Sequence, residues 1–368
     1  MKPFSLLIKP AAADCNLRCE YCFYLDKARL YPVPARHRMP ENVLERLVKS
    51  YLGTPQPVYT FGWQGGEPLL MGIEFFKKLT ELQQYYGKKG DIISNGLQTN
   101  ATLIDDEIAD HLARYRFLLG CSLDGPADVH DRYRRTAGGG STHGDVLRGM
   151  ETLTRHDVAF NVLILVNRAN VGQPVEIYDY LVDRGYYFQQ YIPCVEFDAG
   201  GNLLPFAITG EEWGSFMCRL FDRWHEGDTR RVSIRHFDAL LHKIINNRVQ
   251  VCSLGRNCCQ YFVVEYNGDI YPCDFFVEER FKIGNILDTS WEEAAASRIY
   301  KDFGAQKASW NKDCRGCDCL PLCSGDCLKH RVYAGNRAGN ISWLCPGWKR
   351  FIHYTRDRFR DLAETLNR

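Results

Sequence analysis

The stretch Asp14–Tyr24, DCNLRCEYCFY, contains three cysteines within eight residues, namely Cys15, Cys19 and Cys22. A disulfide uses two cysteines, whereas a structural metal site of the zinc type is closed by about four ligands. Three thiolates spaced C-x3-C-x2-C can hold a 4Fe–4S cluster and leave one iron without a protein ligand. Because an open coordination position is typical of catalytic metal sites, the stretch predicts a catalytic iron–sulfur centre. The alternative is a zinc or structural site that borrows a distant fourth ligand.

The other cysteines are unevenly spread along the chain. Of sixteen in total, ten lie between residues 252 and 345, while Cys121, Cys194 and Cys218 stand alone in the middle. Disulfides are rare in a reducing cytosol, so dense cysteines there indicate metal binding or redox chemistry. We therefore expect two separate metal regions, and we interpret the three isolated cysteines as buried apolar side chains.

Length and composition favour a protein of about two domains with a sizeable core, because the chain has 368 residues and 45% of them are hydrophobic. The formal net charge of +1 gives no global attraction to nucleic acid or to an anionic membrane, and we expect neither as a partner. The apolar run Phe4–Ile8 is shorter than the roughly 7–15 residues of an export signal. No other run approaches the roughly 18 residues of a membrane span, so we expect a cytoplasmic protein.

Apolar runs alternate with amphipathic stretches over residues 1–240. The runs predict six strands: Ser5–Lys9, Val58–Trp63, Ile92–Leu97, Phe117–Leu123, Phe160–Val166 and Phe188–Ile192. The stretches between them have helical periodicity, and several begin with proline or acidic residues, as first helical turns prefer. This alternation predicts an α/β fold with parallel strands, in either a partial barrel or a doubly wound sheet. In both, the chemistry lies at the carboxyl ends of the strands, and the cysteine triplet directly follows the first strand.

The pattern changes at about residue 250, where helical periodicity fades and glycine and cysteine become frequent. In YFVVEYNGDIYPCDF the pair Asn267-Gly268 is a strong turn signal, so this stretch predicts a β-hairpin. The final stretch PGWKRFIHYTRDRFRDLAETL predicts an amphipathic C-terminal helix. We expect a core domain over residues 1–240, a cysteine-rich domain stapled by metal over 241–346, and the helix over 347–368.

Several motifs resemble those of the radical S-adenosyl-L-methionine (SAM) enzymes. They are the cysteine triplet with an aromatic residue before its third cysteine, WQGGEP (Trp63–Pro68), SLDGP (Ser122–Pro126) and HDRYRR (His130–Arg135). In that family the open iron binds SAM, which is cleaved to methionine and a 5′-deoxyadenosyl radical. The resemblance implies a partial (β/α)6 barrel and SAM contacts by Tyr21, Gly66, Ser122, Arg134 and Val195. Taken alone, the Gly-Gly pair would be an ordinary turn, Arg134 a surface charge and Val195 a core residue.

The run C-x2-C-x5-C-x3-C in the second half resembles the core of the SPASM domain, which binds two auxiliary 4Fe–4S clusters. By this resemblance one cluster has the ligands Cys252, Cys258, Cys273 and Cys327, and the other has Cys314, Cys317, Cys323 and Cys345. Cys259 and Cys319 are left over, so the choice between neighbouring cysteines stays open. Two interleaved zinc sites are the alternative, since zinc also takes four thiolates. With the first cluster, the resemblance implies three 4Fe–4S clusters and SAM as cofactors.

Over nearly the whole chain the sequence more specifically resembles the anaerobic sulfatase-maturating enzymes. These radical SAM oxidoreductases convert a cysteine or serine of a sulfatase to Cα-formylglycine. The stretches that carry the resemblance are SLLIKPAAADCNLRCEYCFY, WQGGEPLL, LQTNATLID, SLDGP and VVEYNGDIYPCDFF. One departure is LQTNA, where the family more often has glycine after the asparagine, and we expect it to have little effect.

Asp274 directly follows the predicted ligand Cys273. In the resembling enzymes this aspartate removes the proton of the substrate thiol or hydroxyl, and the alternative is an aspartate that caps a loop beside a metal site. The resemblance further implies a sulfatase segment of the type C/S-x-P-x-R as substrate and an electron donor such as flavodoxin or ferredoxin. Two other hypotheses stay open: a SPASM maturase that forms thioether or carbon–carbon crosslinks in a peptide, and a zinc-stapled binding module without catalysis.

Overall fold

The computed structural model describes residues 2–33, 35–333 and 339–366, and the chain divides into two compact units. Unit 1 comprises Met1–Ser122, Tyr133–Phe160 and Cys258–Gly304. Unit 2 comprises Leu123–Arg132, Asn161–Asn257 and Ala305–Arg368. The two units therefore interleave along the sequence, and each contains part of the cysteine-rich second half.

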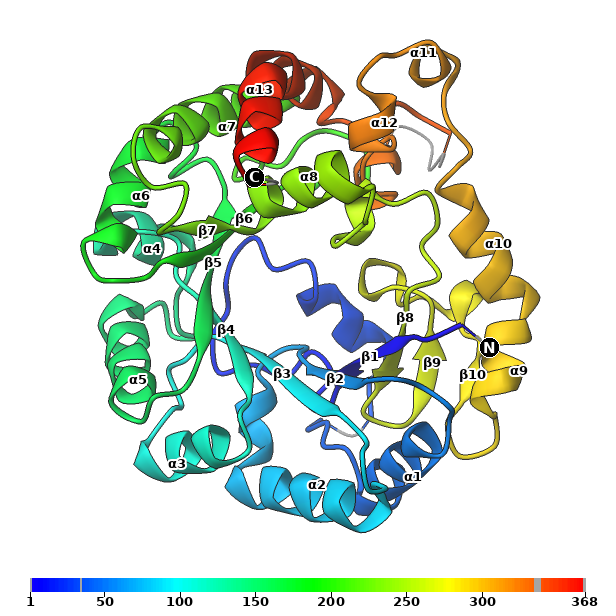
Figure 1. Ribbon diagram of the computed structural model, residues 1–368. Helices are drawn as coiled ribbons and strands as arrows, with labels where there is room; N and C mark the ends of the chain where they lie inside the picture. Colours follow the sequence, from blue (N-terminus) through cyan, green and yellow to red (C-terminus); the bar gives the residue numbers. More distant parts are fainter. Residues whose placement is uncertain (1, 34, 334–338, 367–368) are drawn as a thin grey trace. The chain divides into compact units, whose positions relative to one another are not determined.

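The sheet of unit 1 is mostly parallel. Its strands are β1 (Ser5–Lys9), β2 (Tyr59–Trp63), β3 (Ile93–Thr99), β4 (Leu118–Ser122), β8 (Tyr261–Glu265), β9 (Asp269–Tyr271) and β10 (Gly284–Asn285). They lie in the order β10-β9-β8-β1-β2-β3-β4, as Figure 1 shows. β1 pairs in parallel with both β2 and β8, while β9 and β10 are joined by antiparallel pairing. The late strand β8 therefore extends the early parallel strands.

Helices cover the strands of unit 1. The α-helices are α1 (Glu41–Leu52), α2 (Ile73–Tyr86), α3 (Asp106–Arg114), α5 (His143–Arg155), α9 (Trp291–Ala296) and α10 (Arg298–Gln306), the last of which ends in unit 2. Short 3-10 helices are η1 (Leu25–Leu30), η2 (Pro68–Met71), η4 (Asp274–Phe276) and η5 (Glu279–Phe281). Figure 1 shows α1, α2 and α3 on one face of β1 to β4. Tyr51 of α1 packs against Phe61 of β2 with ring centroids 5.0 Å apart, which buries the apolar face of the helix.

Unit 2 combines three parallel strands with a helical core. Its elements are α4 (Ala127–Tyr133), β5 (Phe160–Val166), α6 (Pro174–Val182), β6 (Phe188–Pro193), α7 (Gly210–His225), β7 (Ser233–Ile234), α8 (Arg235–Asn246), η3 (Cys252–Leu254), α11 (Lys312–Arg315), α12 (Leu320–Cys323), η6 (Lys329–Arg331) and α13 (Cys345–Leu366). β6 pairs in parallel with β5 and β7. Helices α7 and α13 approach so closely that a Cβ on Gly347 would lie only 2.1 Å from Gly210 O. Glycine at this position permits the approach.

The predicted elements are confirmed with small shifts. All six expected strands are present, and each ends within two residues of its expected boundary. The predicted hairpin is β8–β9, with Gly268 at a φ of 91°, which glycine adopts at little cost. The predicted C-terminal helix is α13, which begins two residues earlier, at Cys345. The chain is thus an α/β protein with a large parallel sheet, followed by a cysteine-rich part with a β-hairpin and a C-terminal helix.

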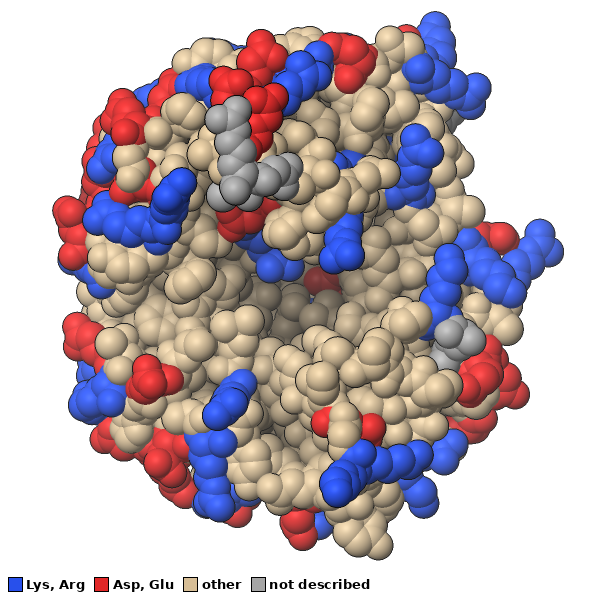
Figure 2. All heavy atoms as spheres, in the orientation of Figure 1, with Lys and Arg blue, Asp and Glu red and all other residues tan. Residues whose placement is uncertain are grey.

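The surface agrees with the near-zero net charge. Figure 2 shows Lys and Arg interspersed with Asp and Glu over the face drawn, without one large patch of either sign. Among the described residues no helix combines the length and the apolar character that crossing a bilayer requires.

Candidate functional site

The cysteine triplet lies in unit 1, in the loop between β1 and η1. Arg18 N donates a hydrogen bond to Arg135 O at 2.8 Å, which ties this loop to the segment after α4. Leu17 N donates to Cys15 Sγ at 3.3 Å. Burial raises the pKa of the Cys15 thiol to about 12, so a bound cation is what would keep this sulfur a thiolate. All sixteen cysteines are described, and none forms a disulfide, which fits metal ligation.

Asp14 fixes the start of this loop. Its carboxylate accepts hydrogen bonds from His37 N at 2.7 Å and from Arg38 Nη1 at 2.9 Å, and it lies 2.8 Å from His37 Nδ1. The other ring nitrogen of His37 lies 2.7 Å from Tyr31 O. The segment before α1 is therefore held against the residue that precedes Cys15.

The WQGGEP stretch forms the loop after β2 and packs directly on the cysteine loop. Gly66 N donates to Ala12 O at 2.7 Å, and Glu67 N donates to Asp14 O at 2.8 Å. A Cβ on Gly66 would lie 1.9 Å from Asp14 O, so only glycine permits this approach. Backbone hydrogen bonds therefore join the loop after β2 to the cysteine loop at a position that requires glycine.

The buried side chain of Glu67 joins the ends of β2 and β3. It accepts hydrogen bonds from Leu69 N and Thr99 Oγ1, both at 2.9 Å, and from Asn100 N at 2.8 Å. Burial raises the pKa of Glu67 to about 7, against the effect of these hydrogen bonds. Asn100 Nδ2 in turn donates to Asn16 Oδ1 at 2.9 Å. One polar network therefore connects two strand ends with the cysteine loop.

Four of the five residues predicted to contact SAM belong to unit 1, and Val195 belongs to unit 2. The Arg134 guanidinium carbon lies 5.5 Å from the centroid of the Tyr21 ring, so the structure brings these two side chains together. Ser122 ends β4, Gly66 follows β2, and Val195 is a buried residue after β6. Each position follows a strand or lies at its end, except Tyr21 and Arg134, which lie in loops packed on each other.

Asp274 is held by three polar residues of unit 1. It begins η4, directly after Cys273, and its side chain is 10% exposed. Tyr261 Oη donates to Oδ1 at 3.2 Å, and Gln64 Nε2 donates to Oδ2 at 3.3 Å. Lys9 Nζ lies 3.8 Å from the same Oδ2. This carboxylate is therefore oriented from β1, β8 and the loop after β2, and it can accept a proton from a bound hydroxyl or thiol.

Lys9, Gln64 and Tyr261 were not among the residues predicted from the sequence. In the sequence Lys9 only marks the end of an apolar run, and Tyr261 has the character of an ordinary strand residue. The available signal was the position of Gln64, a polar side chain at the carboxyl end of a buried strand, where parallel sheets place their chemistry.

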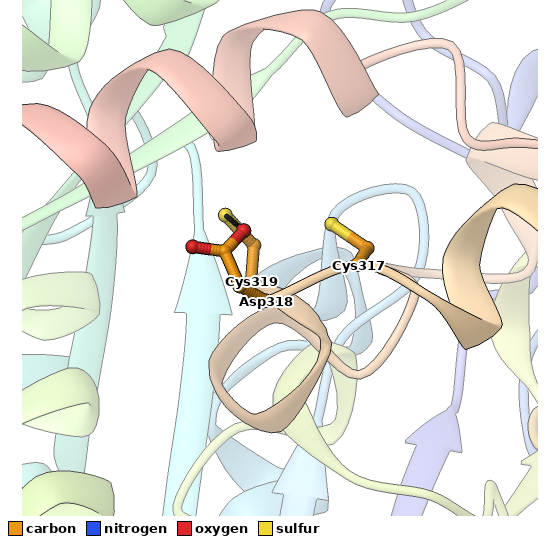
Figure 3. A group of neighbouring side chains, drawn as sticks. All are labelled: Cys317, Asp318 and Cys319. Carbon is orange, nitrogen blue, oxygen red and sulfur yellow. Dashed lines mark hydrogen bonds between the residues drawn. The ribbon is translucent and has the colours of Figure 1, made fainter.

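One predicted set of auxiliary ligands lines a single cavity in unit 2. The cavity is lined by Cys314, Cys317, Cys323 and Cys345, together with the surplus Cys319. Figure 3 shows the sulfur atoms of Cys317 and Cys319 on the same side of their loop, facing α13. The Sγ atoms of these two cysteines and a carboxylate oxygen of Asp318 all lie within 4.8 Å of one another. A donor set this rich in sulfur fits an iron–sulfur cluster.

Both surplus cysteines have partners of their own. Cys319 Sγ lies 3.2 Å from His353 Nε2 of α13, and this ring nitrogen also lies 3.1 Å from Asp318 Oδ1. Cys259 Sγ donates to Tyr300 O at 3.2 Å. Both surplus cysteines are thus bonded within the fold, and the choice between them and the neighbouring predicted ligands stays a prediction.

The second predicted set is divided between the units. Cys252 and Cys327 belong to unit 2, whereas Cys258 and Cys273 belong to unit 1. Cys273 Sγ accepts a hydrogen bond from Tyr261 Oη at 3.3 Å. This set stays a prediction. Cys121, Cys194 and Cys218, the isolated cysteines, are buried, as expected for apolar fillers.

The loop between Cys323 and Cys327 has an unusual backbone. Ser324, Gly325 and Asp326 have φ angles of 49°, 75° and 62°. Outside glycine this left-handed conformation costs about 1–2 kcal/mol per residue, so Ser324 and Asp326 need support from outside the loop.

Three buried cations supply that support. Lys243 Nζ donates to Ser324 Oγ at 2.8 Å, Arg331 Nε donates to Gly325 O at 2.7 Å, and Lys307 Nζ donates to Asp326 O. Hydrogen bonds from charged donors each contribute about 1.5–3 kcal/mol, which outweighs the backbone cost. These hydrogen bonds therefore hold the loop between two predicted ligands in its left-handed conformation.

Ala101 stands in the LQTNA stretch where the family more often has glycine. Ala101 has a φ of 62° and is fully buried. In Ala101→Gly, relief of about 1–2 kcal/mol of left-handed strain is offset by about 0.8 kcal/mol of lost methyl burial and by about 0.4–1 kcal/mol of unfolded-state entropy. We therefore expect the free energy of unfolding to change by less than about 1 kcal/mol, measured by urea denaturation. A larger change of either sign would contradict the expectation of little effect.

Comparison with known proteins identifies the family of this chain. Two family models match, the Radical SAM superfamily over residues 11–181 and the iron-sulfur cluster-binding domain SPASM over residues 252–318. The serine-type anaerobic sulfatase-maturating enzyme of Bacteroides thetaiotaomicron is 33% identical, over 96% of this chain and 89% of the relative. The cysteine-type enzyme of Clostridium perfringens is 35% identical over 100% of both chains. The chain belongs to the anaerobic sulfatase-maturating enzymes.

A solved member of the anaerobic sulfatase-maturating family has the same fold. The structure of native anSMEcpe with bound AdoMet matches with a TM-score of 0.92 and 35% identity, over 98% of this chain and 100% of that chain. The protein is thus a radical SAM oxidoreductase that uses SAM and three 4Fe–4S clusters. Family membership excludes the non-catalytic zinc module and decides between the two sheet architectures in favour of the radical SAM barrel.

Proposed function

We propose that this protein oxidises a cysteine or serine residue of a sulfatase to Cα-formylglycine. Its relatives include both serine-type and cysteine-type sulfatase-maturating enzymes, and anSMEcpe has been solved with a bound Cp18Cys peptide. The observation in this chain that carries the proposal is Asp274, a carboxylate oriented by Gln64, Tyr261 and Lys9 in the same compact unit as the cysteine triplet.

The residues that would hold the cofactors follow from the site. We assign Cys15, Cys19 and Cys22 to the SAM-binding cluster, and Tyr21, Gly66, Ser122, Arg134 and Val195 to SAM itself. The auxiliary clusters would be held by Cys252, Cys258, Cys273 and Cys327, and by Cys314, Cys317, Cys323 and Cys345. When bound, SAM and its cluster would provide the radical that removes a hydrogen atom from the substrate Cβ, and the auxiliary clusters would accept one electron.

A residue of the protein, Asp274, accepts the proton that the substrate loses. Conversion of a serine to the aldehyde removes two hydrogens: the Cβ hydrogen leaves as an atom, and the hydroxyl hydrogen leaves as a proton and one electron. Asp274 accepts that proton as the C–O single bond becomes C=O. A cysteine loses the same two hydrogens to give a thioaldehyde, which water converts to the aldehyde with release of hydrogen sulfide.

The substrate segment and the electron donor that we propose follow from the family, and the compartment follows from the cysteine content. We propose a sulfatase segment of the type C/S-x-P-x-R as substrate and a flavodoxin or ferredoxin as electron donor. Sixteen cysteines without a disulfide suit a reducing compartment such as the cytoplasm.

The test is mass spectrometry of a peptide with this segment after anaerobic incubation with the loaded enzyme, SAM and a reductant. We expect a loss of about 2 Da from the serine peptide, two hydrogens, and the thiol-to-aldehyde change from the cysteine peptide. A crosslinked product would favour the alternative SPASM maturase, and an unchanged peptide with SAM cleaved would overturn the proposal.

The ligand assignment gives a prediction for the iron content. Cys345→Ala removes one of four thiolates from the cavity in unit 2, so we expect the anaerobic protein to lose one cluster. Iron should fall from about twelve to about eight per chain, because each cluster contains about four irons. Iron and sulfide analysis after reconstitution measures this.

Two further variants test whether the loss of iron is specific to a predicted ligand. Cys218 is buried in α7 and belongs to neither predicted ligand set, so Cys218→Ala should keep about twelve irons. Cys319→Ala should also keep them. If Cys319→Ala loses a cluster while Cys345→Ala does not, the assignment of this cavity is wrong.

A further inference from the structure

Lys9 is a buried lysine whose donors are not used by the fold. It ends β1 opposite Glu265 of β8, and it is 0% exposed. Within the described residues its Nζ makes no hydrogen bond. Its amine lies 3.8 Å from Asp274 Oδ2 and 4.6 Å from the centroid of the Tyr24 ring. Burying an amine with unfilled donors is costly, and the ion pair with Asp274 leaves the hydrogen-bond donors of Lys9 unsatisfied.

Other buried lysines of the same protein show what a structural role requires. Lys243 Nζ donates to Leu254 O at 2.6 Å, to Leu322 O at 2.8 Å and to Ser324 Oγ at 2.8 Å. Lys307 Nζ likewise donates to three backbone carbonyls. Each of these lysines fills its donor capacity with acceptors of the fold, whereas Lys9 fills none.

The carboxylates near Lys9 accept their hydrogen bonds from residues other than Lys9. Glu265 accepts a hydrogen bond from Tyr24 Oη, and Asp274 accepts from Gln64 and Tyr261. Burial lowers the pKa of Lys9, while Asp274, Glu265 and two cysteine sulfurs oppose this. Both the protonated and the neutral amine carry N–H donors, so Lys9 can donate a hydrogen bond in either state.

We propose that Lys9 binds the reacting oxygen or sulfur of the substrate beside Asp274 and stabilises the negative charge left there when the proton passes to Asp274. The inference rests on the proposed function, and it adds a residue to the reaction rather than a new reaction. A fixed donor aimed at the atom where charge develops acts most strongly in a buried site.

This role predicts a difference between the two substrates. Oxygen is a strong hydrogen-bond acceptor and sulfur a weak one. A thiol also loses its proton more readily, with a pKa near 8.5 in the free residue. The donor at Lys9 should therefore matter more for serine than for cysteine, and Lys9 becomes a determinant of which residue is oxidised.

The test compares Lys9→Met with the wild type on a serine and a cysteine peptide of the same flanking sequence. We expect kcat for the serine peptide to fall about a hundredfold, as on removal of one oxyanion donor, and kcat for the cysteine peptide to fall less than about tenfold. Lys9→Arg keeps the donors, so it should restore part of the serine activity. Equal losses on both peptides, or no loss on either, would overturn the role.

Lys243→Met is the comparison variant, because it removes a buried lysine whose hydrogen bonds go to Leu254, Leu322 and Ser324, beside predicted cluster ligands. It should lower the melting temperature and leave the ratio of serine to cysteine activity unchanged. A shift of that ratio equal to the shift in Lys9→Met would overturn the role of Lys9.

A binding measurement covers the case in which Lys9→Met is inactive for structural reasons. We would measure the affinity of the anaerobic, SAM-loaded protein for the serine peptide and for its alanine analogue, as a double-mutant cycle. Lys9→Arg should keep the preference of the wild type for serine, and Lys9→Met should lose it. An equal preference in both variants overturns the inference alone, whereas a wild type that makes no aldehyde overturns the proposed function.

Discussion

Asp274→Asn is expected to keep SAM cleavage and to lower aldehyde formation about a thousandfold, within the range of losses for a general base. The asparagine has nearly the same shape and retains an oxygen for Tyr261 or Gln64, but it cannot take the substrate proton. The measurement is the ratio of aldehyde to 5′-deoxyadenosine formed per enzyme under strict anaerobiosis. In the wild type this ratio reports coupled turnover, and in the variant it should collapse.

Asp269→Asn is a matched control from the same hairpin. Asp269 is also buried, but its carboxylate accepts from Tyr31 Oη at 3.2 Å and pairs with Lys282 Nζ at 2.8 Å. This variant should lower stability and change both products in parallel, which leaves their ratio as in the wild type. Full aldehyde formation by Asp274→Asn would remove the assigned role of Asp274.

The parts of the fold that depend on local pattern could be predicted from the sequence. The strand Ser5–Lys9 and the turn at Gly268 were predicted because β-forming runs and the Asn-Gly pair have strong local preferences. The cysteine triplet could be predicted because its ligands are contiguous and need no knowledge of the tertiary fold. Asp274 was found through the resemblance rather than from any local signal.

The surroundings of Asp274 could not be predicted in the same way. The donors to its carboxylate are separated from it by 210 residues at Gln64 and by 13 residues at Tyr261. They meet because β8 pairs in parallel with β1, a long-range choice that no local periodicity reports. Lys9 was interpreted as the end of an apolar run because a charged residue is normally exposed. Its burial follows only from the strands packed around it.

The same limit applies to the cysteines of the second half. Spacing predicted which cysteines could ligate, but it could not separate Cys319 from Cys317. The structure adds a contact that spacing cannot report: α13, a helix later in the chain, brings His353 to 3.2 Å from Cys319 Sγ. The sequence also could not show that the chain folds as interleaved units, because this depends on contacts between segments far apart in the chain.

Gly66→Ala is expected to lower SAM cleavage by at least about a hundredfold, even without any peptide. A Cβ at this position would lie 1.9 Å from Asp14 O and 2.4 Å from Asp14 C, and both are backbone atoms that no rotamer change can move. The loop after β2 must therefore shift away from the residue before Cys15. A misplacement of about 1 Å at a reacting centre can cost a hundredfold in rate, and production of 5′-deoxyadenosine measures it directly.

The control for Gly66→Ala is Gly144→Ala, since a Cβ at Gly144 in α5 meets no heavy atom within 4 Å. Alanine also favours the helix by about 1 kcal/mol over glycine, so this variant should cleave SAM at the wild-type rate and be no less stable. The auxiliary clusters give a second check, because their predicted ligands are remote in sequence from Gly66 and their iron should remain in Gly66→Ala. SAM cleavage at the wild-type rate by Gly66→Ala would mean that the close approach of the two loops has no part in holding SAM.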